Sequence, residues 1–345
     1  MSTTRTVDLY SDTQTRPTPG MRRAIAEAEV GDEQSGRDPT VIELQQRVAD
    51  LLGHEAAVFL PSGTMCNAIA FRLHIRPGGD EVLLHRTSHP VHAEAGGAAA
   101  LAGAVVRILE GDKGQFTAQA LEAAIRPAAP KAPRSRLVSI EQTTNLGGGR
   151  VWPLGQLREV LAVARAHELR AHLDGARLLN AVVASGVSAA EYAREFDTAW
   201  IDFTKGLGAP VGACLAGSRA LIDEAWRYKH MFGGAMRQSG ILAAAGLYAL
   251  DHHVERLAGD HAHARRLAEG LAAVPGLNVD PAAVETNIVL VGCADAPLLV
   301  SRLGAAGVRV GAVDPTTVRM VTHLDVDTEA IEQAIAAARD AAGLF

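Results

Sequence analysis

Short apolar runs alternate along most of the chain with longer segments in which apolar residues recur at helical spacing. Runs of five or six mainly apolar residues predict buried strands, which we expect at 56–60, 81–85, 104–109, 136–141, 170–174 and 198–203. Before and between them the pattern predicts helices at 19–29, 41–52, 66–74, 93–102, 154–167 and 176–184. Strands that alternate with helices form βαβ units, so we expect an α/β fold whose mostly parallel sheet is covered on both faces.

The pattern changes after residue 210. The run at 211–217 predicts an antiparallel return strand, and the long helical zone at 239–274 predicts two helices or one bent helix. Beyond it we expect three strands and a final helix, at 287–292, 308–313, 318–323 and 328–341. This order of elements predicts a smaller α+β unit at the end of the chain.

These changes divide the chain into three expected parts. The first, at 1–20, is a polar N-terminal arm that contains Pro17 and Pro19. A large domain at 21–250 follows, and a small C-terminal domain occupies 251–345.

Composition narrows the class of protein. The 345 residues are 48% hydrophobic and 21% charged, which excludes a disordered chain. The formal net charge of −6 argues against a nucleic-acid partner, because phosphate binding needs a basic patch. No run approaches the ~18 apolar residues of a membrane-spanning helix, so we expect no membrane contact.

The cysteines and the N-terminus bear on the compartment. Cys66, Cys214 and Cys293 lie far apart without CxxC spacing, so we expect buried free thiols rather than disulfides or a zinc site. The first twenty residues lack the apolar segment of a signal peptide. We therefore expect a cytoplasmic protein.

Distinctive residues follow several of the predicted strands, at the edge of a parallel sheet where ligands bind. Pro61-Ser62-Gly63-Thr64 follows the strand at 56–60, and backbone N–H groups at such a helix start suit a phosphate. Taken alone, this segment fits an ordinary β-to-α turn better. The strand at 170–174 ends on Asp174, with Arg177 one turn further on, where a cap with a salt bridge is the alternative.

The strand at 198–203 is followed by Thr204 and Lys205 in a glycine-rich loop. A lysine at the end of an apolar strand is badly placed for solvation, and buried lysines serve as Schiff-base nucleophiles. A side chain that reaches out to solvent is the alternative. A lysine for an imine, an aspartate for a pyridinium nitrogen and an anion site for a phosphate together predict a pyridoxal phosphate site.

Several longer segments resemble one known family. In chain order they are VDLYSDTQTRPTPGMR, VGDEQSGRDPTV, EAAVFLPSGTMCN, EAGGAAAL, HLDGARLLNAVV, TKGLGAPVG, GGAMRQSGILAAAGLYAL and VRMVTHLDV. This set resembles the low-specificity L-threonine aldolases, which are fold-type-I pyridoxal phosphate enzymes of the aspartate aminotransferase-like class. The resemblance implies retro-aldol cleavage of an L-β-hydroxy-α-amino acid, of the threonine or allo-threonine type, to glycine and an aldehyde.

The resemblance also implies a set of cofactor-binding residues. Lys205 would carry the cofactor as a Schiff base, and Asp174 would pair with its ring nitrogen. Gly63 and Thr64 would bind its phosphate, with Thr204 nearby.

On the substrate side, the resemblance implies that Arg177 and Arg319, together with Ser11, hold the carboxylate. Arg177 would therefore lie at the cofactor as well. His89 would stack on the cofactor ring and act as the base, or orient a water, at the substrate hydroxyl. Arg237 would reach the cofactor of a neighbouring subunit, which implies a homodimer or homotetramer with active sites at subunit interfaces.

Two departures from the family concern the substrate. Where relatives often have a second active-site histidine, this chain has Thr144, which we count among the substrate-binding residues. Where relatives commonly have a tyrosine, it reads Gln34-Ser35-Gly36. Both positions bear on the β-substituent and on the threo or erythro preference.

Three alternatives stay open. A β-eliminating lyase would use the same cofactor residues, and a catalytically silent protein could keep the scaffold, although binding alone needs no imine lysine. A metal-dependent hydrolase could draw on the 13 histidines, for instance His89 and His92 with Glu94. A second group, formed by His252, His253, His261 and His263, is expected to be a solvated helix face.

Overall fold

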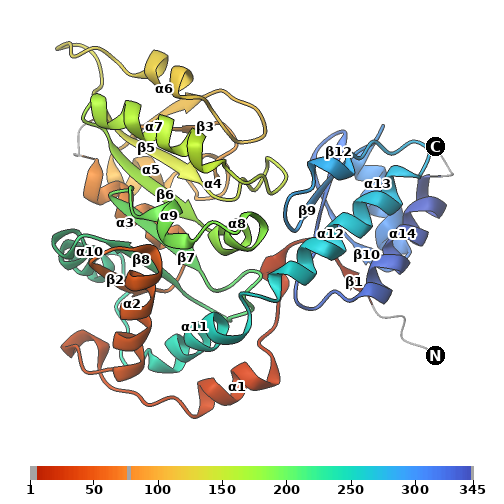
Figure 1. Ribbon diagram of the computed structural model, residues 1–345, viewed down its shortest axis with the longest axis horizontal. Coiled ribbons are helices and arrows are strands. Elements are labelled where there is room, and N and C mark those ends of the chain that lie inside the picture. Colours follow the sequence, from red (N-terminus) through yellow and green to blue (C-terminus); the bar gives the residue numbers. More distant parts are fainter. Residues whose placement is uncertain (1–5, 76–78, 343–345) are drawn as a thin grey trace.

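A seven-stranded sheet forms the centre of the larger part of the molecule (Figure 1). The structure is a computed structural model, and it describes residues 6–75 and 79–342. Residues 1–5 of the expected arm and 343–345 of the expected small domain lie outside this description. In spatial order the strands are β2 (Ala56–Leu60), β8 (Ala213–Gly217), β7 (Thr198–Asp202), β6 (Arg170–Gly175), β5 (Ser135–Glu141), β3 (Glu81–His85) and β4 (Val105–Leu109). Only β8 runs against its neighbours, as expected of the return strand.

Alternate residues of these strands enter different hydrophobic cores. On β2, Phe59 packs into one core, whereas Val58 and Leu60 pack into another on the opposite face. On β3, Leu83 and its neighbour Leu84 divide in the same way. Because both faces are covered, the strands appear in the sequence as continuous apolar runs rather than as alternating patterns.

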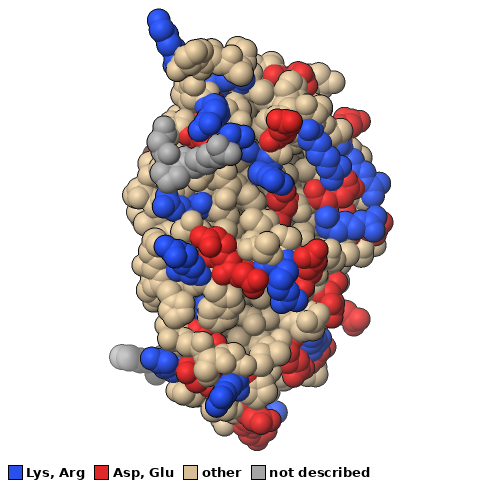
Figure 2. Space-filling view, turned by 90° about the vertical axis from the view of Figure 1, so that its left-hand side faces the viewer, with Lys and Arg blue, Asp and Glu red and all other residues tan. Residues whose placement is uncertain are grey.

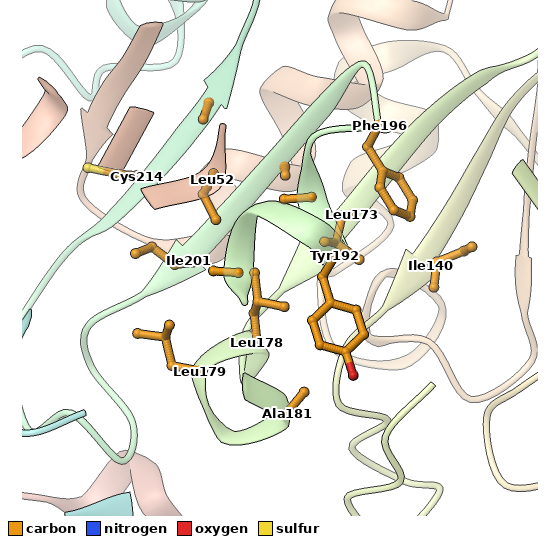
Figure 3. Close-up of a cluster of buried hydrophobic side chains, with 14 of the residues drawn as sticks. Leu52, Ile140, Leu173, Leu178, Leu179, Ala181, Tyr192, Phe196, Ile201 and Cys214 are labelled. Carbon is orange, nitrogen blue, oxygen red and sulfur yellow. The ribbon is translucent and has the colours of Figure 1, made fainter. Parts of the chain in front are cut away.

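Helices cover both faces of the sheet. The larger core involves α1 (Pro19–Ala26), α2 (Pro39–Leu52), α6 (Ala118–Ala124), α7 (Leu154–Ala166), α8 (Leu178–Ser185), α9 (Ala189–Ala193) and α11 (Gly240–His252). The opposite face is covered by α3 (Gly63–His74), α4 (His89–His92), α5 (Gly97–Ala102) and α10 (Arg219–Met231). Figure 3 shows the larger core, where Tyr192 of α9 and Leu178 of α8 lie with Leu173 of β6 in one cluster.

A smaller lobe with its own core contains the end of the chain. Its elements are β1 (Val7–Asp8), α12 (Leu257–Ala272), β9 (Ile288–Gly292), α13 (Ala296–Ala305), β10 (Val308–Arg309), β11 (Gly311–Asp314), β12 (Thr317–Val321) and α14 (Thr328–Ala342). Strands β11, β12 and β9 form an antiparallel sheet, whereas β1 pairs in parallel with β10. The N-terminal strand therefore lies in the lobe built mainly from the C-terminus (Figure 1).

The long helical zone is two helices, α11 and α12. Leu257, at the start of α12, packs into the larger core, whereas Ala264 and Leu267 pack into the core of the smaller lobe. The helix α12 thus crosses from one body to the other. The expected domain boundaries at 20/21 and 250/251 stay predictions.

One predicted helix was wrong in extent, and five helices were not predicted. The segment expected at 93–102 is helical only from Gly97, because Ala95 and Gly96 have φ of 50° and 75°, in the left-handed region. That conformation interrupts the chain after the short helix α4. The helices α4, α6, α9, α10 and α13 were not predicted from the sequence.

Basic and acidic side chains lie side by side on the face shown in Figure 2. Ion pairs at the surface, such as Arg86 with Glu110, join two well-exposed side chains and contribute little to stability. The stability of the fold therefore comes mainly from its hydrophobic cores.

Cys66 and Cys214 are buried free thiols and Cys293 is a half-buried one. Within residues 6–75 and 79–342, no helix combines the length and apolar composition that crossing a membrane would need.

Candidate active site

A cavity of about 520 Å³ lies beyond the carboxyl ends of β5, β6 and β7. Its volume is within the usual range for a small-molecule site. Nine of the eleven predicted site residues line it, namely Ser11, Gly63, Thr64, His89, Asp174, Arg177, Thr204, Lys205 and Arg319. They come from both bodies of the molecule, so the cavity is a site between the two lobes.

Lys205 lies three residues beyond the end of β7 and is mostly buried. Its Nζ donates to the carboxylate of Asp202, the last residue of the strand. Thr204 donates to the other oxygen of Asp202 from its backbone N, at 2.8 Å, and from Oγ1, at 2.7 Å. The Lys205 carbonyl accepts a hydrogen bond of 2.8 Å from Thr15 Oγ1. These contacts hold the loop at 203–212, which we call the lysine loop, against the cavity.

The N-terminus of α3 forms another wall. Ser62 caps the helix by accepting a hydrogen bond from Met65 N, and Gly63 and Thr64 are the first helical residues. The first N–H groups of a helix have no partner inside it, so they are available to an anion. A Cβ on Gly63 would lie 2.2 Å from the Trp200 ring, so only glycine fits this approach.

Asp174 is the penultimate residue of β6 and is 2% exposed. One carboxylate oxygen accepts from Asn67 Nδ2 at 2.8 Å and the other from Ala176 N at 3.1 Å. Burial raises the pKa of Asp174 to about 7, and the nearby carboxylate of Glu141 adds to the rise. A cation beside this carboxyl group would favour its ionised form.

His89 begins α4 and is half-buried. Its backbone N donates to Glu141 Oε2 at 2.9 Å, and its Nδ1 lies 2.7 Å from Glu94 Oε1. The hydrogen bond with Glu94 raises the pKa of His89 against the opposing effect of burial. Because Nδ1 is engaged with Glu94, Nε2 is the ring nitrogen left to the cavity.

Two guanidinium groups lie on the lobe side of the cavity. Arg177 is buried and forms an ion pair with Asp12. Arg319 of β12 donates to Asn145 Oδ1 at 2.6 Å and to the Tyr10 carbonyl at 3.3 Å. Burial lowers the pKa of Arg319, and the positive charge of Arg177 lowers it further. Two guanidinium groups whose positive charges repel each other in one cavity form a site for an anion such as a carboxylate.

Comparison with known proteins assigns the family. The chain matches the family described as beta-eliminating lyase over residues 8–294. It is 41% identical to a probable low-specificity L-threonine aldolase 2 of Arabidopsis thaliana, covering 95% of this chain and 96% of the relative. It is 40% identical to the low specificity L-threonine aldolase of Escherichia coli strain K12, covering 96% and 97%. The chain belongs to the low-specificity L-threonine aldolase family.

The fold agrees with this family. A solved structure of a threonine aldolase from Leishmania major matches with a TM-score of 0.83 and 22% identity, and the match covers 97% of this chain and 99% of that one. The expected fold, an α/β protein of fold type I with a mostly parallel sheet and a smaller lobe, is confirmed.

Two predicted site residues of this threonine aldolase family member do not line the cavity. Thr144 is fully buried behind the cavity. It packs so closely against Gly114 and Gly147 that a Cβ on either glycine would lie within 2.6 Å of a Thr144 atom. The neighbouring residue, Asn145, lines the cavity instead. Arg237 is exposed at the surface, 3.5 Å from the Asp32 carboxylate. Its expected role needs a second subunit and stays a prediction.

Sequence reasoning missed several residues that line the cavity or lie directly behind it. Glu141 and Asp202 line the cavity and end the strands β5 and β7, so the rule that assigned Asp174 would also have found them. Asn67 was missed because it lies inside a helix, where its only signal is a polar residue among apolar neighbours. Glu94 was considered only as a possible metal ligand, whereas its carboxylate accepts a hydrogen bond from Asn67 and lies beside His89.

The second histidine group does not form the solvated face that we expected. His253 and His261 are buried, with His253 Nδ1 donating to the Leu207 carbonyl at 2.7 Å and His261 Nε2 lying 3.2 Å from Asn180 Nδ2. The lysine loop covers His253, and Asn180 of α8 contacts His261. The sequence pattern did not reveal that these elements bury the two histidines. In the part of the chain that the structure describes, no three His, Cys, Asp or Glu side chains are grouped so as to hold a metal ion.

The residues present fit pyridoxal phosphate. The cavity offers an amine on Lys205, a buried carboxyl group on Asp174 that a neighbouring cation would ionise, and open N–H groups at Gly63 and Thr64 for a phosphate. Each part of the cofactor that needs a partner therefore has one of suitable chemistry in this wall.

Proposed function

We propose that this protein cleaves L-β-hydroxy-α-amino acids of the threonine type into glycine and an aldehyde, with pyridoxal phosphate as cofactor. The observation that carries the proposal is the gathering of Lys205, Asp174 and two opposed guanidinium groups in one cavity. Membership of the low-specificity L-threonine aldolase family supports it, because the matches to relatives cover 95% and 96% of the chain.

The cofactor residues lie in the larger body. Lys205 Nζ would attach the cofactor covalently, Asp174 would pair with the ring nitrogen, and the first turn of α3 would bind the phosphate. When bound, pyridoxal phosphate accepts the electron pair that the breaking Cα–Cβ bond releases. Asp174 supports that chemistry because its charge favours a protonated ring nitrogen.

The guanidinium groups of Arg177 and Arg319 would bind the substrate carboxylate, with Ser11 beside them. Binding at two planar donors restricts rotation of the amino acid and so directs the bond to be broken. The carboxylate also relieves the repulsion between the two arginines. Substrate binding should therefore draw the smaller lobe, which carries Arg319, toward the larger body.

His89 would accept the proton of the β-hydroxyl group at Nε2, directly or through a water molecule. Glu94 holds the opposite nitrogen, Nδ1, and the hydrogen bond favours the protonated ring that this transfer produces. Thr144 lies outside the cavity, so Asn145 is the side chain of that segment that would contact the substrate.

The products separate this activity from β-elimination, which the name of the matched family also suggests. The purified protein, loaded with pyridoxal phosphate, is incubated in turn with L-threonine and L-allo-threonine. We expect glycine and acetaldehyde in equal amounts. A keto acid and ammonia would instead establish elimination and overturn the proposal. Lys205→Arg serves as the control, since it keeps a cation in the cavity but should form no stable attachment to the cofactor.

Two further features belong to the proposal. We expect a homodimer or homotetramer in which Arg237 reaches the cavity of a neighbouring subunit. This assignment is supported by its exposed position away from its own cavity. We also expect a cytoplasmic location, which the free thiols of Cys66 and Cys214 support.

A further inference from the structure

A line of buried polar side chains crosses the larger body behind the active site. His74 Nε2 lies 3.0 Å from Thr198 Oγ1, which lies 2.8 Å from His172 Nδ1. His172 Nε2 then lies 3.1 Å from Asn67 Oδ1. The outer end, His74, lines a second cavity of about 1150 Å³, and the inner end is Asn67, which is 1% exposed.

The orientation of the Asn67 amide is determined by its neighbours. Trp200 Nε1 donates to Asn67 Oδ1 at 2.8 Å, and an indole nitrogen can only donate. Burial lowers the pKa of His172 to about 3, so its ring is neutral near pH 7 and can donate to the same oxygen. The amide oxygen therefore faces Trp200 and His172, and Nδ2 must face the other way.

On that other side, Asn67 Nδ2 meets two carboxylates. It lies 2.8 Å from Asp174 Oδ2 and 2.8 Å from Glu94 Oε1, and the same Glu94 oxygen lies 2.7 Å from His89 Nδ1. The two hydrogens of one amide thus supply one hydrogen bond to each carboxylate. A neutral donor is needed here, because a third carboxylate would repel both.

We propose that Asn67 is a positioning residue of the active site, holding the carboxylate beneath the cofactor ring nitrogen and the carboxylate behind His89 in one fixed arrangement. The inference rests on the proposed function, because that function assigns the ring nitrogen to Asp174 and the proton transfer to His89. Asn67 touches neither cofactor nor substrate in this scheme, and it acts through Asp174 and Glu94.

The arrangement has a measurable effect on Asp174. Several ionisable groups face it from neighbouring elements, namely Glu141 on β5, His89 and Glu94 on the segment from α4 to α5, and Cys66 on α3. Burial raises the pKa of Asp174 most, and Glu141 and Glu94 raise it further, whereas the hydrogen bond from Asn67 and the charge of His89 lower it. Loss of the Asn67 N–H should therefore raise this pKa, and loss of the Glu94 charge should lower it.

The test measures binding of pyridoxal phosphate to the cofactor-free protein, without substrate, from its visible absorbance between pH 6 and 9. The wild type is compared with Asn67→Asp, Glu94→Gln and Thr198→Val. In Asn67→Asp we expect the pH below which affinity declines to move up by about one unit, with roughly tenfold weaker binding at pH 7. In Glu94→Gln the same pH should move down.

Thr198→Val is the matched control, because it breaks the same buried line two hydrogen bonds farther from the carboxylates. It leaves the bond from Trp200 to Asn67 intact. We expect lower thermal stability and an unchanged pH profile of cofactor binding. A profile displaced as far as that of Asn67→Asp would assign the effect to the fold and overturn the proposal.

The remaining outcomes are equally decisive. If the wild type binds cofactor and Asn67→Asp has the wild-type profile, the proposed function stands and the role of Asn67 is wrong. If the wild type forms no absorbance band, the proposed function fails and this inference fails with it. If Asn67→Asp does not fold, Glu94→Gln decides, since the absence of a downward displacement would contradict the arrangement.

Discussion

The guanidinium of Arg177 is held by the carboxylate of Asp12 through two hydrogen bonds, from Nε and from Nη2, each of 2.7 Å. Both side chains are buried, and Asn287 Nδ2 gives Asp12 a further hydrogen bond of 3.1 Å. Burial alone would raise the pKa of Asp12, but Arg177 holds it well below its usual range. The pair thus holds the arginine in one orientation, with Nη1 left free of Asp12.

Asp12→Asn should lower the free energy of unfolding by about 3–5 kcal/mol, because it leaves a buried guanidinium without its counter-ion. The KM for substrate should rise, since the arginine is no longer held in one orientation. Urea denaturation at pH 7 measures the first effect and initial rates measure the second.

The stability effect of Asp12 has a defined pH dependence. Because its pKa is depressed in the folded state, its contribution is present above the ordinary aspartate range and is lost as the pH falls below it. The difference between wild type and Asp12→Asn should shrink accordingly. Glu332→Gln, which breaks the exposed two-bond pair with Arg266, is the control and should change little. Equal losses in the two variants would mean that burial does not matter here.

Cofactor-induced stabilisation should increase from pH 6 to pH 8. Without cofactor, the buried carboxyl group of Asp174 favours the neutral form, so the free protein loses stability as the pH rises from about 4 toward 7. With cofactor, the ionised form would pair with the ring nitrogen, so binding should strengthen as the pH rises through about 7. The difference in Tm between loaded and free protein measures this. In Asp174→Asn that difference should be small and nearly independent of pH.

His89→Asn should lower kcat by ~10²–10⁴-fold while the visible absorbance of the bound cofactor is retained, because it removes the proposed base and leaves Lys205 and Asp174 in place. The control is His92→Asn on the same short helix, where the ring is exposed and lies 2.7 Å from the Arg86 carbonyl. His92→Asn should keep wild-type turnover. Wild-type turnover in His89→Asn would rule out the proton-transfer role.

Arg237→Ala should keep the fold, since the side chain is exposed, yet weaken cofactor binding about tenfold if Arg237 acts in a neighbouring cavity. Equilibrium binding of pyridoxal phosphate, together with sedimentation of the same samples, measures both effects. Arg266→Ala, another exposed arginine, should have no effect on binding. Unchanged cofactor affinity in Arg237→Ala would remove the residue from the site.

The sheet and the lysine loop could be predicted because strands covered on both faces leave continuous apolar runs. Asp174 and Lys205 follow from that prediction, since each lies where such a run ends. Asn67 could not be found in this way, because its partners His172 and Asp174 are more than a hundred residues away in sequence. A polar residue inside a helix does not reveal which buried groups it meets.

The burial of helix faces was a second feature that could not be predicted from the sequence. His253 and His261 were expected on a solvated helix face, yet both are buried, His253 against the Leu207 carbonyl and His261 against Asn180 of α8. Thr144 was expected to face the substrate, but the turn after β5 directs Asn145 into the cavity instead. Which neighbour of a loop residue faces a cavity depends on backbone directions that the pattern of apolar residues does not encode.

The smaller lobe is joined to the larger body by two covalent crossings, one between β1 and α1 and one within α12. A lobe connected at two points can rotate about the line that joins them, but its rotation about other axes is restricted. The first crossing also contains Ser11 and Asp12, which belong to the cavity and to the Arg177 pair. A rotation of the lobe that brings Arg319 inward would therefore bend the same segment that orients Arg177, so we expect the positions of the two arginines to change together.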